Sequence, residues 1–498
     1  MRILLVTSSF EDESRESEIQ SNSHYPLGLA YIHAYLEQKK HEVKTLFLND
    51  FLHEDCYQKV KETLHRFKPE VVGLNILTNN RVSSYFLIEY IHKHHPNIRI
   101  VIGGIHTTVM HEQLLSKYPY LIAVIGEGEI TLATLLEKFA KNKPIDDVLG
   151  ISFYKDNRLI TTPSRPLVDN LDLLPFPKHE AFLNPSRTRA CLLTSRGCPF
   201  NCSFCVLDVI SKRRVRFRSV ISVINEIEYL MKANPNLDEV WLHDDVFLID
   251  NNRAIDFCNE IIKRKIKLNF VCSARFKPIS KELVQKLEQA GFITVLFGLE
   301  SGDPKILKTA GKQITQNDVL HAIKLFTNSK IEVRTFLIVG LYGENNSSVK
   351  KTIKLVKKMQ RIKYIYFPDI GICAIFPGTQ IYSLAKQAGI IDDSYWLTDK
   401  PTPFFTVEHS AEQLLKYKKQ ILNHISFNNF FTPKGFTAQV TMTPHILKFI
   451  ITSHTPTSTL FCLLTPLLKK AKKHAPFLYD KMRLIYHKSI KSRLTKSE

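Results

Sequence analysis

Two long stretches of the chain alternate short apolar runs with segments of helical periodicity. In the first stretch, residues 1–142, the apolar runs are 3–6, 42–48, 71–77, 98–102 and 121–125. Between them, apolar side chains recur three or four residues apart, as at Leu29, Ile32 and Leu36, which is the spacing of one helix face. Strands that alternate with helices form a parallel sheet covered on both faces. The sequence therefore predicts an α/β protein that begins with a Rossmann-like, doubly wound parallel sheet.

The second stretch, residues 188–385, repeats this alternation. Its strand candidates are 190–194, 239–243, 268–273, 293–299, 332–339 and 364–375. Its helix candidates are 220–231, 253–264, 281–290, 316–328 and 347–360. In α/β folds the chemistry takes place on the loops that follow the strands. Polar residues at the strand ends are therefore the candidates for function.

Three cysteines, Cys198, Cys202 and Cys205, lie within eight residues just after the first strand of this second stretch. Thiolates in one short loop converge on one point, which suits an iron–sulfur cluster. Three thiolates leave one iron of a four-iron cluster open to a substrate or a cofactor. The alternatives are a zinc knuckle and three buried thiols. Zinc usually takes four nitrogen or sulfur ligands in paired spacing, and the sequence has no second cysteine or histidine pair nearby.

The spacing C-x3-C-x2-C, with Phe204 before the last cysteine, resembles the signature of the radical S-adenosylmethionine (radical SAM) enzymes. The resemblance implies a partial (β/α)6 TIM-like barrel over residues 188–385 and a 4Fe-4S cluster whose open iron chelates SAM. Paired aspartates after the second strand and a Gly-x-Glu-Ser string after the fourth recur around SAM in that family. On this basis we assign SAM contacts to Asp245, Arg275, Glu300 and Ser301, with Phe204 near the adenine. Salt bridges, helix caps or core packing are the alternative roles for these side chains.

The loops after the N-terminal strands carry the strings Pro-Leu-Gly-Leu, Gly-Gly-Ile-His-Thr and Gly-Glu-Gly-Glu. These strings, in this order, resemble the cobalamin-binding domain that precedes the radical core in the B12-binding radical SAM proteins. The resemblance implies cobalamin contacts at Leu27, Gly28, Asn75, Gly103, Gly104, His106, Thr107, Gly126, Glu127 and Gly128. The Asp-x-His-x-x-Gly motif that supplies a cobalt ligand in many other B12 proteins is absent after the first strand. We therefore expect no histidine ligand from that loop.

Two alternatives remain open for this domain. His106 is also explained as an ordinary hydrogen-bonded loop histidine. The domain as a whole is also explained as a nucleotide-binding or scaffolding unit, although no G-x-G-x-x-G follows the first strand, which disfavours a dinucleotide.

The two alternating stretches are joined by a predicted linker, residues 143–187. Two short strands, 148–154 and 158–162, meet at Asp156-Asn157, which is a hairpin signal. Prolines then interrupt any helix. After residue 385 the pattern changes, and residues 386–498 are predicted to form a mainly helical, basic C-terminal region. Aromatic residues there, such as Phe427 and Phe430, either line a substrate pocket or belong to a core.

The composition places the protein in a reducing compartment. Nine cysteines in 498 residues, an odd and uneven set, fit a reduced cytosol and not a disulfide framework. The first residues read as a buried strand, so we expect no signal peptide. From Lys434 onward twelve lysines and arginines face only Asp480 and Glu498, which is about half of the net charge of +20. We expect a cytoplasmic protein whose basic tail either contacts an anionic membrane surface or is simply solvated.

These features together predict a cobalamin-dependent radical SAM enzyme that methylates an unactivated carbon of a small-molecule or lipid-like substrate. The family implies an external electron donor of the flavodoxin or ferredoxin type. Oxidative ring formation or rearrangement without methyl transfer is possible on the same architecture. A tRNA-modifying methylthiotransferase would need three more cysteines in the N-terminal domain, and only Cys56 precedes Cys191. This disfavours a nucleic-acid substrate. The intact cysteine triad argues against a non-catalytic binding module.

Overall fold

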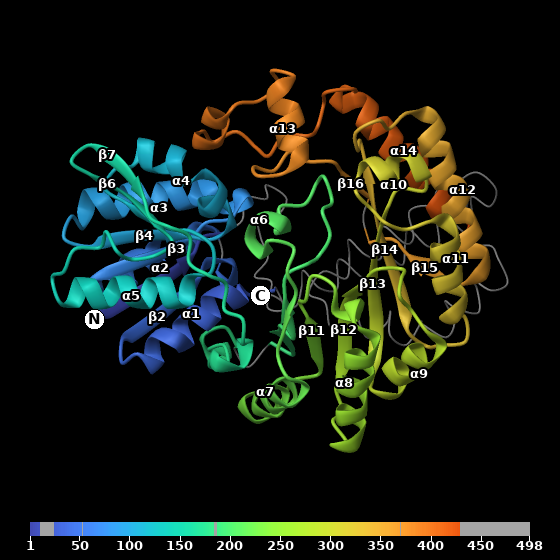
Figure 1. Cartoon of the computed structure of the whole chain (residues 1–498), viewed down its shortest axis with the longest axis horizontal. Coiled ribbons are helices and arrows are strands. Elements are labelled where there is room, and N and C mark those ends of the chain that lie inside the picture. Colours follow the sequence, from blue (N-terminus) through green and yellow to red (C-terminus); the bar gives the residue numbers. More distant parts are fainter. Residues whose placement is uncertain (10–23, 52, 184–186, 369, 429–498) are drawn as a thin grey trace, which may run out of the picture. The chain divides into compact units, whose positions relative to one another are not determined.

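The N-terminal part forms a sheet of seven strands in the order β2-β1-β3-β4-β5-β6-β7 (Figure 1). The computed structural model describes residues 1–9, 24–51, 53–183, 187–368 and 370–428. The first five strands are parallel: β1 (Arg2–Thr7), β2 (Glu42–Phe47), β3 (Val71–Asn75), β4 (Arg99–Gly103) and β5 (Ile122–Val124). The order 2-1-3-4-5 is one of the common doubly wound arrangements, which bind ligands at the carboxyl ends of the strands next to the switch between β1 and β3. The predicted doubly wound sheet is confirmed.

Helices cover both faces of this sheet, as strands that are apolar on both sides require. Alternate residues of β1 pack to opposite sides: Leu4 and Val6 toward one group of helices, Ile3 and Leu5 toward the other. The first group comprises α2 (His53–Phe67), α3 (Arg81–His94) and α4 (Ile105–Lys117). The second comprises α1 (Leu27–Gln38) and α5 (Gly128–Ala140).

The hairpin expected in the linker belongs to the sheet. Strands β6 (Ile151–Lys155) and β7 (Arg158–Thr161) add to β5 in antiparallel pairing. Asp156 and Asn157 turn the chain with positive φ values of 50° and 59°, which suits a two-residue hairpin. The sheet therefore extends to Thr161, past the residue 142 at which the sequence pattern ended. The local pattern identified the hairpin correctly but contains no information on which strand it pairs with.

The second alternating stretch forms a separate parallel sheet in the order β15-β14-β13-β12-β11-β8. The strands are β8 (Arg189–Leu192), β11 (Glu239–Leu242), β12 (Asn269–Ala274), β13 (Phe292–Glu300), β14 (Glu332–Val339) and β15 (Ile365–Tyr366). A further short strand, β16 (Ile370–Ile372), also pairs with β14, so the long sixth strand predicted from the sequence is two short ones. A two-stranded ribbon, β9 (Ser195–Arg196) and β10 (Arg216–Phe217), lies beside the cysteine loop.

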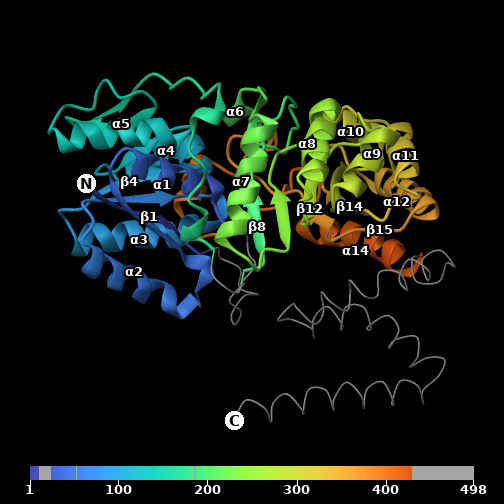
Figure 2. The same cartoon turned by 90° about the horizontal axis from the view of Figure 1, so that it is seen from below.

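Helices line one side of this barrel sheet, and their apolar faces share one core with the strands (Figure 2). They are α7 (Val220–Ala233), α8 (Asn251–Lys263), α9 (Lys281–Gln289), α11 (Gln316–Leu325), α12 (Asn346–Ile362) and α14 (Ala411–Asn428). Shorter helices are α6 (Leu207–Ser211), α10 (Pro304–Thr309) and α13 (Gln380–Gln387). Single 3-10 turns occur at Leu48–Asp50, Thr78–Asn80, Leu171–Leu173, His179–Ala181, Phe247–Ile249 and Asp393–Leu397.

Side-chain caps fix where several of these helices begin. Ser219, Asp250, Ser280 and Thr315 each accept a backbone N–H of the first turn of α7, α8, α9 and α11. Asp303 does the same for α10, where Pro304 occupies the first helical position. These caps stop the strand-to-helix loops at defined residues, which keeps the loops short.

The structure describes the C-terminal region only up to residue 428. Helix α14 lies within the region that was predicted to be mainly helical, and it packs on the barrel core through Leu414, Tyr417 and Ile421. The basic tail, the predicted membrane contact and Phe430 lie outside the described residues. Within the part of the chain that is described, no helix combines the length and apolarity needed to cross a membrane.

Candidate active site

The three cysteines occupy one loop between β9 and α6. Gly197 starts the loop with φ of 96°, and a Cβ atom there would lie 2.1 Å from the carbonyl oxygen of Arg214, so only glycine fits. The backbone N–H of Cys205 donates to the carbonyl of Cys202 at 3.0 Å, which closes a turn. All three thiols are half-buried. Burial raises the pKa of Cys198 and raises that of Cys205 to about 11, and the nearby thiol of Cys202 raises both further.

Asp244, after β11, supports the start of this loop. Its carboxylate is buried and accepts hydrogen bonds from the N–H of Thr194 at 2.6 Å, the hydroxyl of Thr194 at 2.6 Å and the hydroxyl of Ser195 at 2.5 Å. Sequence reasoning noted the aspartate pair but gave a role only to its second member. The structure shows that the first member holds the strand end from which the cysteine loop departs.

Asp245 lies against the cysteine loop. Its Oδ2 accepts the N–H of Gly197 at 3.2 Å, and its charge acts on Cys198 and Cys205. Burial, with the negative charge of Asp244 beside it, raises the pKa of Asp245 to about 6. A half-buried carboxyl group with this pKa can accept or share a proton near neutrality.

Arg275 directly follows β12 and points at the same loop. Its Nη1 is 3.9 Å from Sγ of Cys202, and its guanidinium stacks 3.6 Å from the ring centroid of Phe200. The side chain is buried, and Nη2 has no hydrogen-bond partner among the described residues. A buried guanidinium nitrogen without a partner is costly in a folded protein. It therefore fits a site that receives an anionic group, such as a cluster held by thiolates or the carboxylate of SAM.

Glu300 and Ser301 end β13 but already have protein partners. Glu300 adopts φ of 63° at a register shift of the strand, and its carboxylate pairs with Nζ of Lys312 at 2.8 Å. Ser301 is fully buried; its hydroxyl lies 3.3 Å from that of Thr352 and accepts the N–H of Asp303 at 3.2 Å. Lys312 has no sequence signal of its own. The assignment of Glu300 and Ser301 to SAM binding stays a prediction.

Phe204 is half-buried and packs on the apolar cluster that includes Ile306, Leu341 and Ile375. This is the packing role that was the alternative to an adenine contact, and one ring can fill both roles.

The predicted cobalamin loops lie at the carboxyl ends of β1, β3, β4 and β5. No atom of the described residues lies within 4 Å of the positions where Gly28 and Gly126 would carry a Cβ atom, so this part of the chain leaves their backbone uncovered. Gly104, with φ of 96°, is different, because a Cβ atom would lie 2.5 Å from Oδ1 of Asn75. Asn75 in turn donates to the hydroxyl of Thr7 at 3.3 Å, across the switch point of the sheet. Uncovered backbone at Gly28 and Gly126 would let a large flat cofactor approach these loops closely.

The other predicted cobalamin residues of these loops pack inside the domain. Leu27 is buried in α1, the hydroxyl of Thr107 bonds to the carbonyl of Gly103 at 2.9 Å, and a Cβ atom on Gly128 would meet Ile32 at 2.9 Å. Their contribution to cobalamin binding stays a prediction that concerns their backbone atoms.

His106 does not lie free in a loop. It is buried in α4, and its two ring nitrogens contact the hydroxyls of Thr78 at 3.1 Å and Tyr85 at 3.0 Å. Burial lowers its pKa to about 3, so the ring is neutral. Both nitrogens are taken by protein partners, which leaves neither for a cofactor. The position matches the ordinary hydrogen-bonded histidine that was the alternative reading, in a helix and not in the predicted loop.

Glu127 ties the predicted cobalamin loop after β5 to the start of the cysteine loop. Its carboxylate pairs with Arg196 at 3.0 Å and with Arg216 at 2.9 Å, while Arg196 also pairs with Glu129 at 2.7 Å. Arg196 lies two residues before Cys198. Neither arginine was recognised from the sequence, because nothing in their local pattern marks them.

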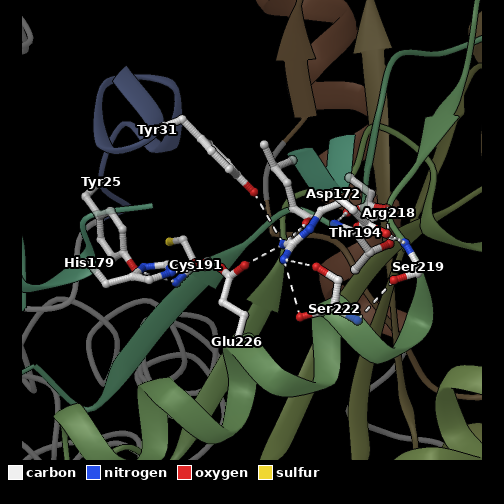
Figure 3. A network of polar contacts seen from close by, with 12 residues as sticks. Tyr25, Tyr31, Asp172, His179, Cys191, Thr194, Arg218, Ser219, Ser222 and Glu226 are labelled. Atoms are coloured by element: carbon white, nitrogen blue, oxygen red, sulfur yellow. Dashed lines mark hydrogen bonds and ion pairs between the residues drawn. The ribbon is translucent and has the colours of Figure 1, made fainter. Parts of the chain in front are cut away.

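A second polar network, around β8, joins the segment before α1 to α7 of the barrel region (Figure 3). Arg218 pairs with Glu226 of α7 at 2.5 Å, and Glu226 contacts His179 at 2.8 Å. His179 contacts the hydroxyl of Tyr25 at 2.7 Å, just before α1. The side chains are buried. Arg218 is therefore a buried structural ion-pair residue.

Comparisons with known proteins agree with this arrangement. Residues 192–356 match the radical SAM superfamily, and residues 21–136 match the B12 binding domain. An uncharacterized methyltransferase of Pyrococcus horikoshii is 29% identical over 444 residues, which cover 87% of this chain and 93% of that protein. The anaerobic magnesium-protoporphyrin IX monomethyl ester cyclase of Rubrivivax gelatinosus is 28% identical over 403 residues, or 78% of this chain and 70% of that protein.

A solved structure shares the fold. The radical S-adenosylmethionine methyltransferase TsrM from Kitasatospora setae, with cobalamin and a 4Fe-4S cluster bound, aligns with a TM-score of 0.66 at 20% identity over 78% of each chain. These matches define the class of the protein as radical SAM enzymes. More particularly, the chain belongs to the B12-binding, cobalamin-dependent radical SAM family. Its cofactors are a 4Fe-4S cluster, SAM and cobalamin.

Proposed function

We propose that this enzyme transfers a methyl group to an unactivated carbon of a small-molecule or lipid-like substrate. The observation that carries the proposal is the ion-pair cluster of Glu127, Arg196 and Glu129. It links the glycine-rich loop of the sheet to the loop of the three cysteines. Methyl transfer to an inert carbon needs both cofactor loops at one substrate. The methyltransferase relative that spans most of this chain supports the same reaction.

The residues of the chain have distinct roles in this proposal. When bound, the cluster and SAM supply hydrogen abstraction from carbon, and cobalamin supplies the methyl group. Cys198, Cys202 and Cys205 hold the cluster. Arg275 places a buried positive charge beside Cys202, and its Nη2, which has no hydrogen-bond partner among the described residues, would bind an anionic group of SAM. Asp245 presents a carboxyl group that can accept hydrogen bonds from SAM.

An apolar substrate is supported by exposed rings in the barrel region. On β14, Val333 and Leu337 pack under the helices, so the alternate residue Phe336 lies on the opposite face, where it is 39% exposed. Other large rings with similar exposure are Tyr366, Phe376 and Phe404. A lipid-like or polycyclic substrate would cover such rings.

An oxidative ring-forming reaction without methyl transfer is the second candidate. The cyclase relative favours it, because its similarity also extends over most of this chain. The two reactions differ in what happens to the methyl group of SAM.

Anaerobic reconstitution with iron, sulfide, SAM and cobalamin tests the proposal. With extracts or apolar candidate substrates and methyl-labelled SAM, methyl transfer yields 5'-deoxyadenosine, S-adenosylhomocysteine and labelled product. Formation of 5'-deoxyadenosine with no label in any product would replace methyl transfer by the oxidative reaction. Cys202→Ala should abolish both 5'-deoxyadenosine and the labelled product.

We also propose that an acidic one-electron donor of the flavodoxin or ferredoxin type reduces the cluster. A surface hollow beside the cysteine loop supports this partner. Its lining includes Asn201 of that loop together with Lys277, Lys308 and Lys312. A Cβ atom on Gly311 would lie 2.3 Å from the carbonyl oxygen of Asn201, so the hollow and the cysteine loop are in direct contact. Positive charge at the rim would attract an acidic donor.

A further inference from the structure

A second group of metal-binding side chains lies apart from the cysteine loop. His24 precedes α1, Cys191 is on β8, and His243 directly follows β11. Nδ1 of His24 is 3.0 Å from Nε2 of His243 and 3.6 Å from Sγ of Cys191. The three ligand atoms all lie within 4.8 Å of one another. They come from three separate segments, so the fold and not a local motif brings them together.

Strand alternation explains why Cys191 and His243 share a face. Ala190 and Leu192 pack into the core under the barrel helices, so Cys191 between them projects to the opposite face. Leu242 packs into the same core, and His243 beyond it is on that opposite face as well. The two strands are paired in parallel, with Leu192 beside Leu242.

The backbone of Cys191 is held from both sides by one hydroxyl. The hydroxyl oxygen of Tyr25 accepts the N–H of Cys191 at 3.1 Å and donates to its carbonyl at 3.3 Å. Figure 3 shows this tyrosine next to Cys191. The ring of His24 packs 4.6 Å from that of Trp241. Cys191 and His24 are thus positioned by contacts that involve no ligand.

The separations match the geometry of zinc. Bonds of about 2.0–2.1 Å to nitrogen and about 2.3 Å to sulfur at tetrahedral angles place two nitrogens about 3.3 Å apart and a nitrogen and a sulfur about 3.6 Å apart. The observed 3.0 Å and 3.6 Å are close to these values. The third pair, Sγ of Cys191 and a ring nitrogen of His243, lies within 4.8 Å, so these two atoms must approach each other before all three occupy corners of one tetrahedron.

We infer that His24, Cys191 and His243 bind one divalent ion of the zinc class, with a fourth coordination position filled by water. Such an ion would fasten the segment before α1 to two strands of the barrel. The inference is independent of the proposed methyl transfer.

The charge state of the three side chains suits this role. A divalent ion binds the lone pair of a neutral imidazole and the sulfur of a thiolate, so metal binding would release the proton of Cys191. Arg187 and Arg189 also face the group, and Glu239 pairs with Arg189 at 2.5 Å. The thiolate and Glu239 offset part of this positive charge.

Elemental analysis of the anaerobically purified, zinc-supplemented holoenzyme tests the inference. We expect one zinc per chain in addition to the iron of the cluster. His24→Ala and His243→Ala should each lose the zinc and keep the iron. His92→Ala is the matched control, because that ring stacks on Tyr120, away from the group, and its loss should leave the zinc in place.

Cobalt titration separates this group from the cluster thiols. In the full chain with Cys198, Cys202 and Cys205 changed to alanine, Co²⁺ should give a thiolate-to-cobalt charge-transfer band that zinc abolishes. Adding Cys191→Ser, which keeps the size of the side chain, should remove the band. If the holoenzyme binds no zinc, or if the zinc or the band survives these substitutions in chains with normal circular dichroism, His24 and His243 form only a hydrogen-bonded pair and the inference is wrong.

Discussion

At the scale of single residues, the site combines side chains that the protein satisfies with side chains that it leaves open. Asp244 accepts three hydrogen bonds and holds the strand end from which the cysteine loop departs. Arg275, one strand away, is buried with one nitrogen lacking a partner among the described residues. The difference separates residues that hold the cysteine loop from residues that await a cofactor.

Arg275→Gln should weaken the use of SAM while leaving the cluster in place. Losing a charge-assisted hydrogen bond costs about 1.5–3 kcal/mol, which is about 10-fold to 100-fold in kcat/KM for 5'-deoxyadenosine formation. Iron content should stay at the wild-type level, since the three thiols are unchanged. Arg213→Gln, a change at an exposed arginine, is the control. Equal kcat/KM values in the two variants would remove Arg275 from the site.

Glu344 should make stability depend on pH. Burial raises its pKa to about 7 in the folded protein, where its carboxylate accepts the N–H of Gly340 at 2.5 Å. The folded state then holds more protons than the unfolded state between about pH 4.5 and 7, so the free energy of unfolding falls as pH rises through this window. The loss is on the order of 2–3 kcal/mol.

Thermal midpoints of the wild type and Glu344→Gln between pH 5 and 7.5 measure this pH-dependent contribution of Glu344 to stability. The wild type should lose more of its midpoint than the variant as pH rises. Parallel curves for the two proteins would show that Glu344 does not titrate in this range. Glu412→Gln, on the exposed side of α14, should follow the wild type.

At the scale of elements, two loops from different sheets share one ion-pair cluster. Arg196 lies between Glu127 and Glu129 and is itself largely buried. If Arg196 is replaced, Glu127 keeps its ion pair with Arg216. The buried carboxylate of Glu129 then loses the only ion-pair partner found for it among the described residues.

Arg196→Met should therefore lower the free energy of unfolding by about 3–5 kcal/mol, the usual result of leaving a buried charge unpaired. Adding Glu129→Leu should recover much of the loss, because the unpaired charge is then gone. Chemical denaturation followed by circular dichroism measures both. Lys155→Met, which breaks an exposed pair with Asp146, should leave the free energy of unfolding nearly unchanged. A similar small change for Arg196→Met would contradict the role of the cluster.

The glycines of the N-terminal sheet allow a paired test of cofactor binding. No described atom lies near a Cβ position on Gly28, so Gly28→Val should leave the thermal midpoint nearly unchanged while its side chain occupies space that bound cobalamin would need. Overpacking costs about 1–3 kcal/mol, or about 10-fold to 100-fold in cobalamin affinity. Gly104→Ala should instead lower the midpoint, because its φ of 96° and the contact with Asn75 exclude a Cβ atom. Cobalamin titration by absorbance compares the two; full affinity in Gly28→Val would move the cofactor away from this loop.

At the scale of the whole molecule, the lysines beside the cysteine loop should govern electron delivery. Lys308→Glu should raise the KM for an acidic flavodoxin several-fold, and added salt should weaken the wild type in the same way. Dithionite, which needs no docking surface, is the control reductant. Lys40→Glu, a change far away in the sequence at the end of α1, is the matched charge reversal. Identical KM values for the donor in the two variants would show that this hollow is not the docking site of the electron donor.

The sequence predicted the two sheets, the segments along the chain that form their strands, and the cysteine loop. Hydrophobic periodicity and local residue spacing determine these features. The hairpin 151–161 was assigned to a linker, since a strand pattern does not state its partner. Lys312, Arg196 and Arg216 were missed for a related reason: each is defined by a carboxylate far away in the chain. His106 shows the reverse case, in which a residue in a family string is used for packing.

The hold of Asp244 on Thr194 and Ser195 has a consequence for damage by oxygen. These bonds, and those from Arg253 to Thr194, are made by polypeptide atoms alone. When air strips the iron, the strand end that carries the cysteines should therefore keep its shape. Repair then requires new iron, sulfide and a reductant that returns the three thiols to the reduced state, but the chain does not have to fold again.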